Sequence, residues 1–180
     1  MPLVLLDRDG VINEDSPRYV KSRDEWQPIP GSIDAIVALK RGGFAVAVCT
    51  NQSAIARGLM DEHALAAVHR RMCDALSARG AALDAIYYCP HGSNDGCDCR
   101  KPKPAMLLRA MSELGHTPSE TTAVGDSMRD LHAARAARCG RSVLVRTGNG
   151  RSCEASAAHC RGVEVFDDLA AFAAALLARC

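Results

Sequence analysis

The chain has 180 residues, of which 48% are hydrophobic and 24% charged, and its formal net charge at pH 7 is +1. This balance is typical of a globular domain and gives no reason to expect nucleic acid or an anionic membrane as a partner. No apolar run approaches the roughly 20 residues of a membrane span. Because the first apolar run starts at residue 3, we expect no signal peptide, a cytoplasmic location and a single domain over residues 1–180.

Short apolar runs alternate with helical periodicities along the chain. In order, strands are expected over residues 3–6, 44–49, 83–88, 121–124 and 142–145, and helices over residues 32–41, 61–79, 104–114, 127–138 and 167–178. The polar connection 11–30 is expected to be a loop, and the Gly-, Ser- and Ala-rich stretch 147–161 a loop or only weakly structured. This alternation predicts an α/β, Rossmann-like fold, with a central, mostly parallel sheet and helices on both faces.

Several predicted strands lead into polar residues. The first strand ends in Asp7 and Asp9, the second in Thr50 and Asn51, and the fourth in Asp126. In open α/β sheets ligands bind outside the carboxyl ends of the strands, so these side chains form a candidate site. No large apolar insertion follows either of the first two strands, so we expect no large cap domain and an open site.

The residue types at these strand ends indicate phosphoryl transfer. Clustered carboxylates repel one another unless a cation lies among them, and an all-oxygen site of this kind suits Mg²⁺. Lys101, which lies just beyond a cysteine-rich loop, would add a positive charge to the same edge. A carboxylate nucleophile, a magnesium ion, a hydroxyl donor and a lysine together can transfer a phosphoryl group, with the cations neutralising its oxygens.

Four stretches resemble the four motifs of the haloacid dehalogenase (HAD) superfamily of aspartate-nucleophile phosphatases. In chain order they are Asp7-Arg8-Asp9-Gly10-Val11-Ile12-Asn13, the strand-ending Thr50, Lys101, and Gly125-Asp126-x-x-x-Asp130. The resemblance spans nearly the whole chain and implies the HAD fold. It also implies that Asp7 is the nucleophile and that Asp9 is the general acid and later the base that activates water. Thr50 and Lys101 would hold the transferring phosphoryl group.

The same resemblance implies the magnesium ligands. Asp7 and Asp126 would bind Mg²⁺ through their carboxylates, and Asp9 through its backbone carbonyl. Asp130 would support the site without binding the ion directly.

Nine cysteines are many for a chain in which no disulfide framework is expected. Four potential zinc ligands share the loop 89–99, and they are Cys89, His91, Cys97 and Cys99. A Cys₃His set is typical of closed structural zinc sites, so we predict Zn²⁺ that orders this loop and the following Arg100 and Lys101. The alternatives are reduced surface cysteines or a redox pair. The other six are expected to be ordinary thiols: Cys49 (buried), Cys73, Cys139, Cys153, Cys160 and Cys180.

A zinc loop followed by Arg-Lys-Pro is similar to two phosphatase families of the superfamily, one acting on D-glycero-D-manno-heptose 1,7-bisphosphate and one on histidinol phosphate. Residues 9–13, 50–58 and 145–148 resemble the heptose family. The five-residue gap between His91 and Cys97 is closer to the histidinol family. Two residues depart from the heptose pattern, Ala54, where Gly is common, and Ser127, where Lys is frequent.

The distal phosphate of a bisphosphate substrate needs cations, whereas histidinol phosphate carries an amine and would prefer acidic or neutral partners. Arg57 and Arg100 are the expected cations, and Arg18 and Lys21 are weaker candidates that we expect to be solvated surface charges. Further substrate contacts are expected from Asn51, Gln52, Ser53 and Lys101. We therefore favour a monomeric, Mg²⁺-dependent phosphatase that removes the 7-phosphate of the heptose bisphosphate, in the synthesis of ADP-heptose for lipopolysaccharide core.

Two alternatives belong to other functional classes. A receiver-type signalling domain also places aspartates, a threonine and a lysine on a parallel sheet, but its phosphoacceptor follows a mid-chain strand. A zinc-stabilised binding module with a decayed site is the other alternative. Both predict no turnover, so an assay with the heptose bisphosphate and Mg²⁺ separates them from a phosphatase.

Overall fold

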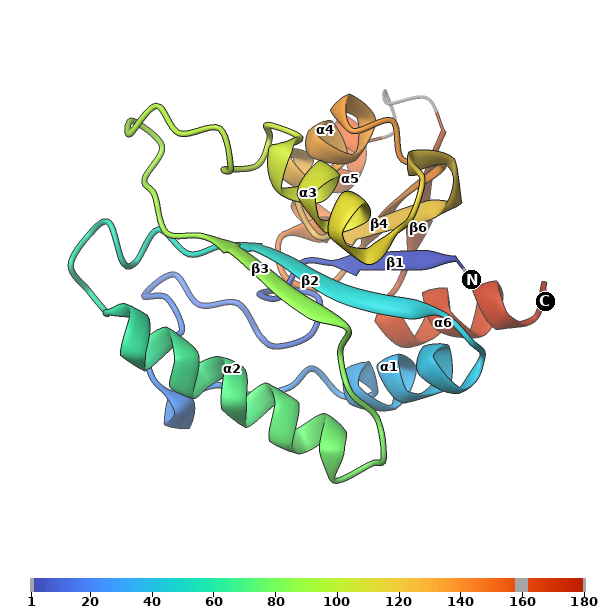
Figure 1. The fold of residues 1–180 in the computed structure, drawn as a ribbon, viewed down its shortest axis with the longest axis horizontal. Helices are drawn as coiled ribbons and strands as arrows, with labels where there is room; N and C mark the ends of the chain where they lie inside the picture. Colours follow the sequence, from blue (N-terminus) through green and yellow to red (C-terminus); the bar gives the residue numbers. More distant parts are fainter. Residues whose placement is uncertain (1, 158–161, 180) are drawn as a thin grey trace.

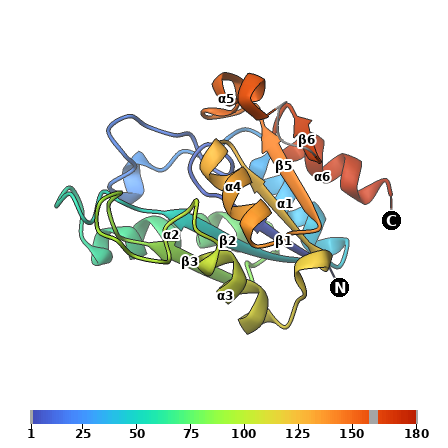
Figure 2. The same cartoon turned by 90° about the horizontal axis from the view of Figure 1, so that it is seen from above.

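The computed structural model describes residues 2–157 and 162–179. The strands are β1 (Leu3–Leu6), β2 (Ala45–Asn51), β3 (Ala85–Cys89), β4 (Thr121–Gly125), β5 (Arg141–Val145) and β6 (Val163–Phe166). They form one sheet in the order β3-β2-β1-β4-β5-β6, and each pair of neighbours is parallel (Figures 1 and 2). The predicted α/β fold is confirmed.

Helices cover both faces of this sheet, as Figure 1 shows. One face carries α1 (Ser32–Arg41), α2 (Glu62–Ser77) and α6 (Leu169–Leu177), and the other carries α3 (Ala105–Leu114), α4 (Met128–Ala136) and α5 (Gly150–Ala157). Two 3₁₀ turns, η1 (Arg23–Glu25) and η2 (Pro118–Glu120), lie in connections. No helix in residues 2–157 and 162–179 combines the length and apolar character that crossing a membrane requires.

The central strand β1 shows why the apolar run at the start of the chain is continuous. Val4 and Leu6 pack into the cluster under α1, α2 and α6, whereas Leu3 and Leu5 pack into the cluster under α3 and α4. All four side chains are at most 1% exposed. A strand that is buried on both faces needs apolar residues at every position, and the polar residues therefore begin where the strand ends.

The region after β5 differs from the prediction. The sequence predicts a loop or only weak structure over residues 147–161, but α5 occupies residues 150–157 of it, and β6 is not predicted. Ala157 packs against Leu131 and Leu144, so tertiary contacts stabilise a helix with a weak apolar pattern. The β6 residues are only half-buried at the sheet edge, which weakens their strand signal. The remaining predictions here, for residues 158–161, Cys160 and Cys180, lie outside the described residues.

The strand order creates a crevice at the carboxyl end of β1. Connections leave β1 toward β2 on one side, and β4 returns to pair with β1 on the other, which is the arrangement that opens ligand sites in such sheets. Figure 1 shows three long connections at this end of the sheet: residues 7–31, 52–61 and 90–104.

Candidate active site

The carboxyl ends of β1 and β4 bring three carboxylates together. The backbone N–H of Asp7 donates to the Val124 carbonyl at 2.9 Å, which extends the β1–β4 pairing by one residue. Asp126 directly follows β4, and Asp130 lies in the first turn of α4. One oxygen of each carboxylate lies within 4.8 Å of the others. The sheet register therefore places residues that are more than a hundred positions apart within reach of one cation.

Lys101 inserts its ammonium group between these carboxylates. Its Nζ lies 3.1 Å from Asp7 Oδ1 and 2.6 Å from Asp130 Oδ1, and it donates to the Cys49 carbonyl at 2.7 Å. Burial alone would lower the pKa of Lys101, but the carboxylates of Asp130 and Asp7 raise it. The lysine is thus a fixed cation beside the predicted nucleophile, and the same ion pair lowers the pKa of Asp130 despite its burial.

The surroundings of Asp7 and Asp126 disfavour the ionised form of both side chains. Burial raises the pKa of Asp7 to about 7, with Lys101 opposing the shift and the carboxylates of Asp130 and Asp126 adding to it. Burial also raises the pKa of Asp126 to about 6, against the hydrogen bonds from Asn149. A divalent cation would favour the ionised form of both groups. Buried carboxylate oxygens with raised pKa are a donor set that fits Mg²⁺.

Two glycines allow the backbone to approach Asp126 closely. A Cβ on Gly10, which has a φ of +80°, or on Gly148 would lie 2.2 Å from Asp126 Oδ2. The same oxygen accepts hydrogen bonds from the Asn149 backbone N–H at 2.8 Å and from its side-chain amide at 3.1 Å. The Thr147 hydroxyl donates to the Gly10 carbonyl at 2.6 Å and joins the two segments. No side chain could occupy either glycine position without displacing Asp126.

Asp9 is held by a separate set of donors. Its carboxylate accepts hydrogen bonds from Arg8 Nε at 3.1 Å and Nη2 at 2.8 Å, from Asn13 Nδ2 at 2.9 Å and from Gln52 Nε2 at 2.9 Å. Burial opposes ionisation of Asp9, but the charge of Arg8 and these hydrogen bonds outweigh it and lower the pKa. These contacts therefore favour the ionised form of Asp9, whereas the surroundings of Asp7 favour its protonated form.

The end of β2 contributes residues with different roles. The buried Thr50 hydroxyl accepts a hydrogen bond from Gln52 Nε2 at 2.9 Å. The Asn51 amide brackets the backbone of Lys101, accepting from its N–H at 3.1 Å and donating to its carbonyl at 3.0 Å. Gln52, predicted to contact substrate, is buried with its amide committed to Asp9 and Thr50, so the structure places it behind these groups.

A cavity of about 390 Å³ opens at this strand edge. The predicted site residues on its wall are Asp7, Asp9, Thr50, Asn51, Ser53, Arg57, Arg100, Lys101 and Asp126. Arg57 and Arg100 therefore face the same space as the carboxylates. The wall also includes residues that were not predicted for the site: Ser93, Arg129 and Asn149, and Asp15, Ser16, Pro17 and Tyr19 of the connection 11–30. Arg129 lies inside the Asp126-x-x-x-Asp130 motif, which could have indicated it, whereas Ser93 and Asn149 lie in loops without any distinguishing pattern.

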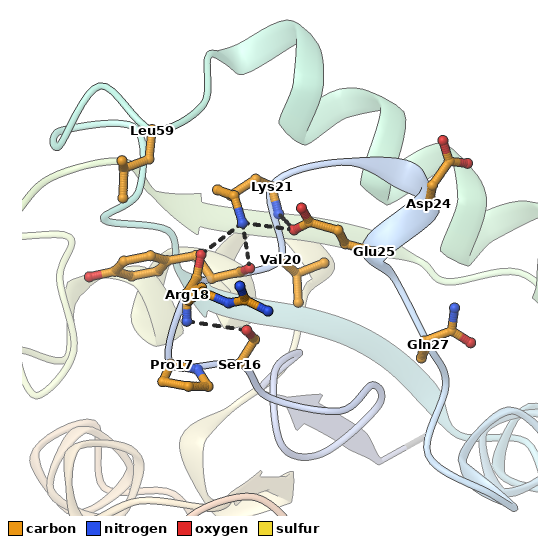
Figure 3. A pocket seen from close by; sticks show the side chains of 10 residues that line it. Ser16, Pro17, Arg18, Val20, Lys21, Asp24, Glu25, Gln27 and Leu59 are labelled. Carbon is orange, nitrogen blue, oxygen red and sulfur yellow. Dashed lines mark hydrogen bonds and ion pairs between the residues drawn. The ribbon is translucent and has the colours of Figure 1, made fainter.

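The weaker candidates Arg18 and Lys21 line a different cavity, of about 690 Å³ (Figure 3). The segment 16–19 separates it from the carboxylate cavity and contributes lining residues to both. Lys21 Nζ donates to the Arg18 carbonyl at 2.9 Å and lies 3.0 Å from Glu25 Oε2. The larger cavity has none of the clustered carboxylates, so the chemistry predicted for this chain is associated with the smaller one.

The cysteine loop forms a second cluster of potential metal ligands. One ligand atom from each of Cys89, His91, Cys97 and Cys99 lies within 4.8 Å of the others. The Cys89 and Cys99 sulfurs are 3.1 Å apart, and His91 Nδ1 is 3.4 Å from the Cys99 sulfur. All four positions converge on one point, as the predicted Cys₃His site requires. Elsewhere in the described residues Cys49 is buried, as predicted, and Cys73, Cys139 and Cys153 are free thiols.

The sequence over residues 2–138 matches the haloacid dehalogenase-like hydrolase family. The chain belongs to this family. Similarity extends to D-glycero-β-D-manno-heptose-1,7-bisphosphate 7-phosphatase of Pseudomonas aeruginosa, at 51% identity over 97% of each chain. The bacterial relatives with this name include one from Bordetella bronchiseptica, at 48% identity over 98% of each chain.

Solved structures of the family agree with this assignment. A D,D-heptose 1,7-bisphosphate phosphatase from B. bronchiseptica, complexed with magnesium and phosphate, matches this hydrolase with a TM-score of 0.96 and 47% identity over 100% of both chains. The heptose bisphosphate phosphatase of Burkholderia thailandensis matches with a TM-score of 0.78 and 40% identity over 98% of this chain and 99% of the other. The predicted HAD fold is confirmed, and hydrolase relatives favour the enzyme over the receiver-type alternative.

Proposed function

We propose that this chain is a Mg²⁺-dependent phosphatase that removes the 7-phosphate of D-glycero-D-manno-heptose 1,7-bisphosphate through an aspartyl-phosphate intermediate. The observation that carries the proposal is the position of Lys101, whose Nζ lies 3.1 Å from Asp7 and 2.6 Å from Asp130 beside Asp126. A fixed cation beside a carboxylate nucleophile suits phosphoryl transfer, because it neutralises the phosphoryl oxygens. The names of the relatives supply the sugar bisphosphate as substrate class.

In the first step, Asp7 attacks phosphorus, and the bond from phosphorus to the sugar oxygen breaks. Lys101 and the Thr50 hydroxyl bind the phosphoryl oxygens, while Asp9, in its protonated form, gives its proton to the departing sugar oxygen. In the second step, Asp9 takes a proton from the water that attacks the aspartyl phosphate, which releases phosphate and regenerates Asp7. Contacts that lower the pKa of Asp9 favour the ionised form used in this second step.

Magnesium would be held by the carboxylates of Asp7 and Asp126 and by the Asp9 backbone carbonyl. When bound, it supplies positive charge that keeps Asp7 ionised and neutralises the phosphoryl oxygens. Asp130 would act indirectly, because its two oxygens are occupied by Lys101 Nζ at 2.6 Å and the Ser127 hydroxyl at 2.5 Å.

We further propose that Zn²⁺ binds the Cys₃His cluster and has a structural role. No ligand position is left open for substrate when four protein groups coordinate the ion. The ordered loop would fix Arg100, whose Nη1 donates to the His91 carbonyl at 3.0 Å, and Lys101, which directly follows it. Zinc would therefore support catalysis by placing cations on the cavity wall.

Arg57 and Arg100 would bind the distal phosphate, because both line the carboxylate cavity. Histidinol phosphate has no second anion for them to meet. We propose that the protein works as a monomeric single domain, residues 1–180, in the cytoplasm, with the heptose bisphosphate of the lipopolysaccharide-core pathway as its small-molecule substrate and with no nucleic-acid or membrane partner.

The test is a comparison of kcat/KM for both anomers of the heptose 1,7-bisphosphate with that for histidinol phosphate, in the presence of Mg²⁺. We expect release of one phosphate per heptose bisphosphate, with heptose 1-phosphate as the product seen by ³¹P NMR. The reverse preference would identify a histidinol-phosphate phosphatase. Arg57→Ala and Arg100→Ala should each raise KM for the bisphosphate about tenfold, as expected for a lost charge-assisted hydrogen bond. Arg70→Ala, on the exposed side of α2, is the control.

A further inference from the structure

Arg8 is a fully buried cation between the two motif aspartates, with a side-chain exposure of 0%. Its Nε and Nη2 donate to Asp9, and Nη2 also donates to Gln52 Oε1 at 3.2 Å. A buried guanidinium requires partners for its donors, since a buried donor without a partner loses its hydrogen bonds to water and gains none in return. These contacts provide partners for Nε and Nη2, so Nη1 needs a partner from another part of the chain.

The partner of Nη1 comes from a different element of the fold. His69, in the middle of α2, places Nε2 3.4 Å from Arg8 Nη1. Within residues 2–157 and 162–179 it is the one hydrogen-bond partner of Nη1. The His69 ring also lies against Tyr88 of β3, with ring centroids 6.0 Å apart at 60°. The imidazole is therefore held between a strand and the buried guanidinium.

The positive charge of Arg8 favours the neutral form of the neighbouring His69 imidazole over the protonated form. Burial, and then the positive charge of Arg8, lower the pKa of His69 to about 4. The imidazole is neutral at neutral pH, with its proton on Nδ1 and the Nε2 lone pair free to accept from Arg8. A hydrogen bond of this kind orients the guanidinium without adding charge to the site.

We propose that His69 is a positioning residue, which holds Arg8 so that the guanidinium fixes the Asp9 carboxylate at the cavity. The chain of contacts runs from α2 through His69 and Arg8 to Asp9, and Gln52 extends it to Thr50. The inference rests on the proposed function, because it assigns to Asp9 the acid and base roles given above. Helix α2 then has a part in catalysis although none of its residues lines the carboxylate cavity.

The test uses the two leaving groups that differ in their need for a proton. A sugar alkoxide must be protonated as it leaves, whereas p-nitrophenolate is stable without a proton. His69→Phe keeps an aromatic ring against Tyr88 and removes the acceptor. We expect His69→Phe to lower kcat/KM for the heptose 1,7-bisphosphate about tenfold, which is part of what a general acid usually contributes. For p-nitrophenyl phosphate, kcat/KM should fall less than about twofold. His69→Gln, whose amide reaches the place of Nε2, should restore most of the loss.

The control is His63→Phe, because His63 lies on the same helix and is exposed. Equal losses on both substrates in His69→Phe, or no loss on either, would overturn the proposal. A second readout needs no turnover: the crystal structure of His69→Phe should show the Arg8 guanidinium and the Asp9 carboxylate displaced, and unchanged positions of both would also overturn it. Wild-type protein without activity on the heptose bisphosphate would instead contradict the proposed function, while the crystal structure still decides the role of His69.

Discussion

The carboxylate site and the cysteine cluster are both candidate metal centres, but the fold holds them in different ways. Asp7 and Asp126 follow adjacent strands, and the β1–β4 register sets their separation. In the cysteine cluster only Cys89 belongs to a strand, and His91 and Cys97 lie in a half-exposed loop without regular structure. The sheet positions the carboxylates by itself. The cysteine loop has little hydrophobic burial of its own, so we expect it to need the proposed zinc ion for order.

We therefore expect the two proposed metal ions, Mg²⁺ and Zn²⁺, to have different roles. An ion among strand-end carboxylates adds charge to a rigid site, and its own position is open to substrate. An ion enclosed by four side chains contributes folding free energy to a segment that would otherwise be poorly ordered. The cysteine cluster and the carboxylate site meet at Arg100 and Lys101, where the cysteine loop ends on the wall of the carboxylate cavity.

The largest expected effect is a loss of activity in a variant that still folds. Asp7→Asn removes the proposed nucleophile but keeps the size of the side chain, so kcat for the heptose bisphosphate should fall by about 10⁴-fold or more. Zinc content, measured by mass spectrometry of the metal, should stay at that of the wild type. Asp34→Asn, at an exposed position on α1, is the matched control and should keep full activity. Substantial turnover by Asp7→Asn would refute the nucleophile assignment.

The second prediction concerns how ionisation of the clustered carboxylates affects the stability of the protein when no magnesium is added. The pKa of Asp7 is raised from 3.8 to about 7 in the folded state, so the folded protein holds this proton more tightly than the unfolded chain does. The resulting contribution to the free energy of unfolding is complete below about pH 4 and is lost as the pH rises to about 7. Asp7→Asn removes this loss. The free energy of unfolding of the variant relative to the wild type should therefore increase between pH 4 and pH 7, by on the order of 2–4 kcal/mol.

Urea unfolding in magnesium-free buffer measures this difference. The pKa of His69 is lowered to about 4 from its ordinary 6.5, so its contribution to stability grows as the pH rises through the same window. It is present in both proteins and cancels in the comparison. Saturating Mg²⁺ should stabilise the wild type more at pH 7 than at pH 5. A difference between the two proteins that does not change with pH would contradict the electrostatic account of the site.

The smallest expected effect tests the cysteine loop. Cys97→Ser should abolish stoichiometric zinc binding and lower kcat/KM by about 10- to 100-fold, the usual effect of disturbing groups that orient a site. The carboxylates proposed to be catalytic remain in place, so activity should be reduced and not lost. Cys73→Ser is the control, because Cys73 is exposed and lies outside the cluster. One equivalent of zinc in Cys97→Ser would count against this ligand set.

Local sequence patterns were sufficient to predict the elements that form around the site. The apolar run before Asp7 and the one before Asp126 predict buried strands, and Asp61 marks the start of α2, where its side chain accepts from the Ala64 N–H at 2.7 Å. These signals are local because a strand buried on both faces and a helix N-cap each require particular residue types at adjacent positions. The Cys₃His spacing is equally local.

The contacts that tertiary structure decided are those between elements. The sequence does not show that Gln52 lies behind Asp9, or that Arg129 faces the cavity. It also gives no sign that His69 reaches Arg8 across 61 positions. α5 and β6 were missed for a related reason, since a weakly patterned helix and an edge strand are stabilised by the neighbours they pack against. Residue types and spacing therefore determined which chemistry this chain carries. The packing of helices on the sheet determined which groups support it, because long-range contacts leave no periodic trace in the sequence.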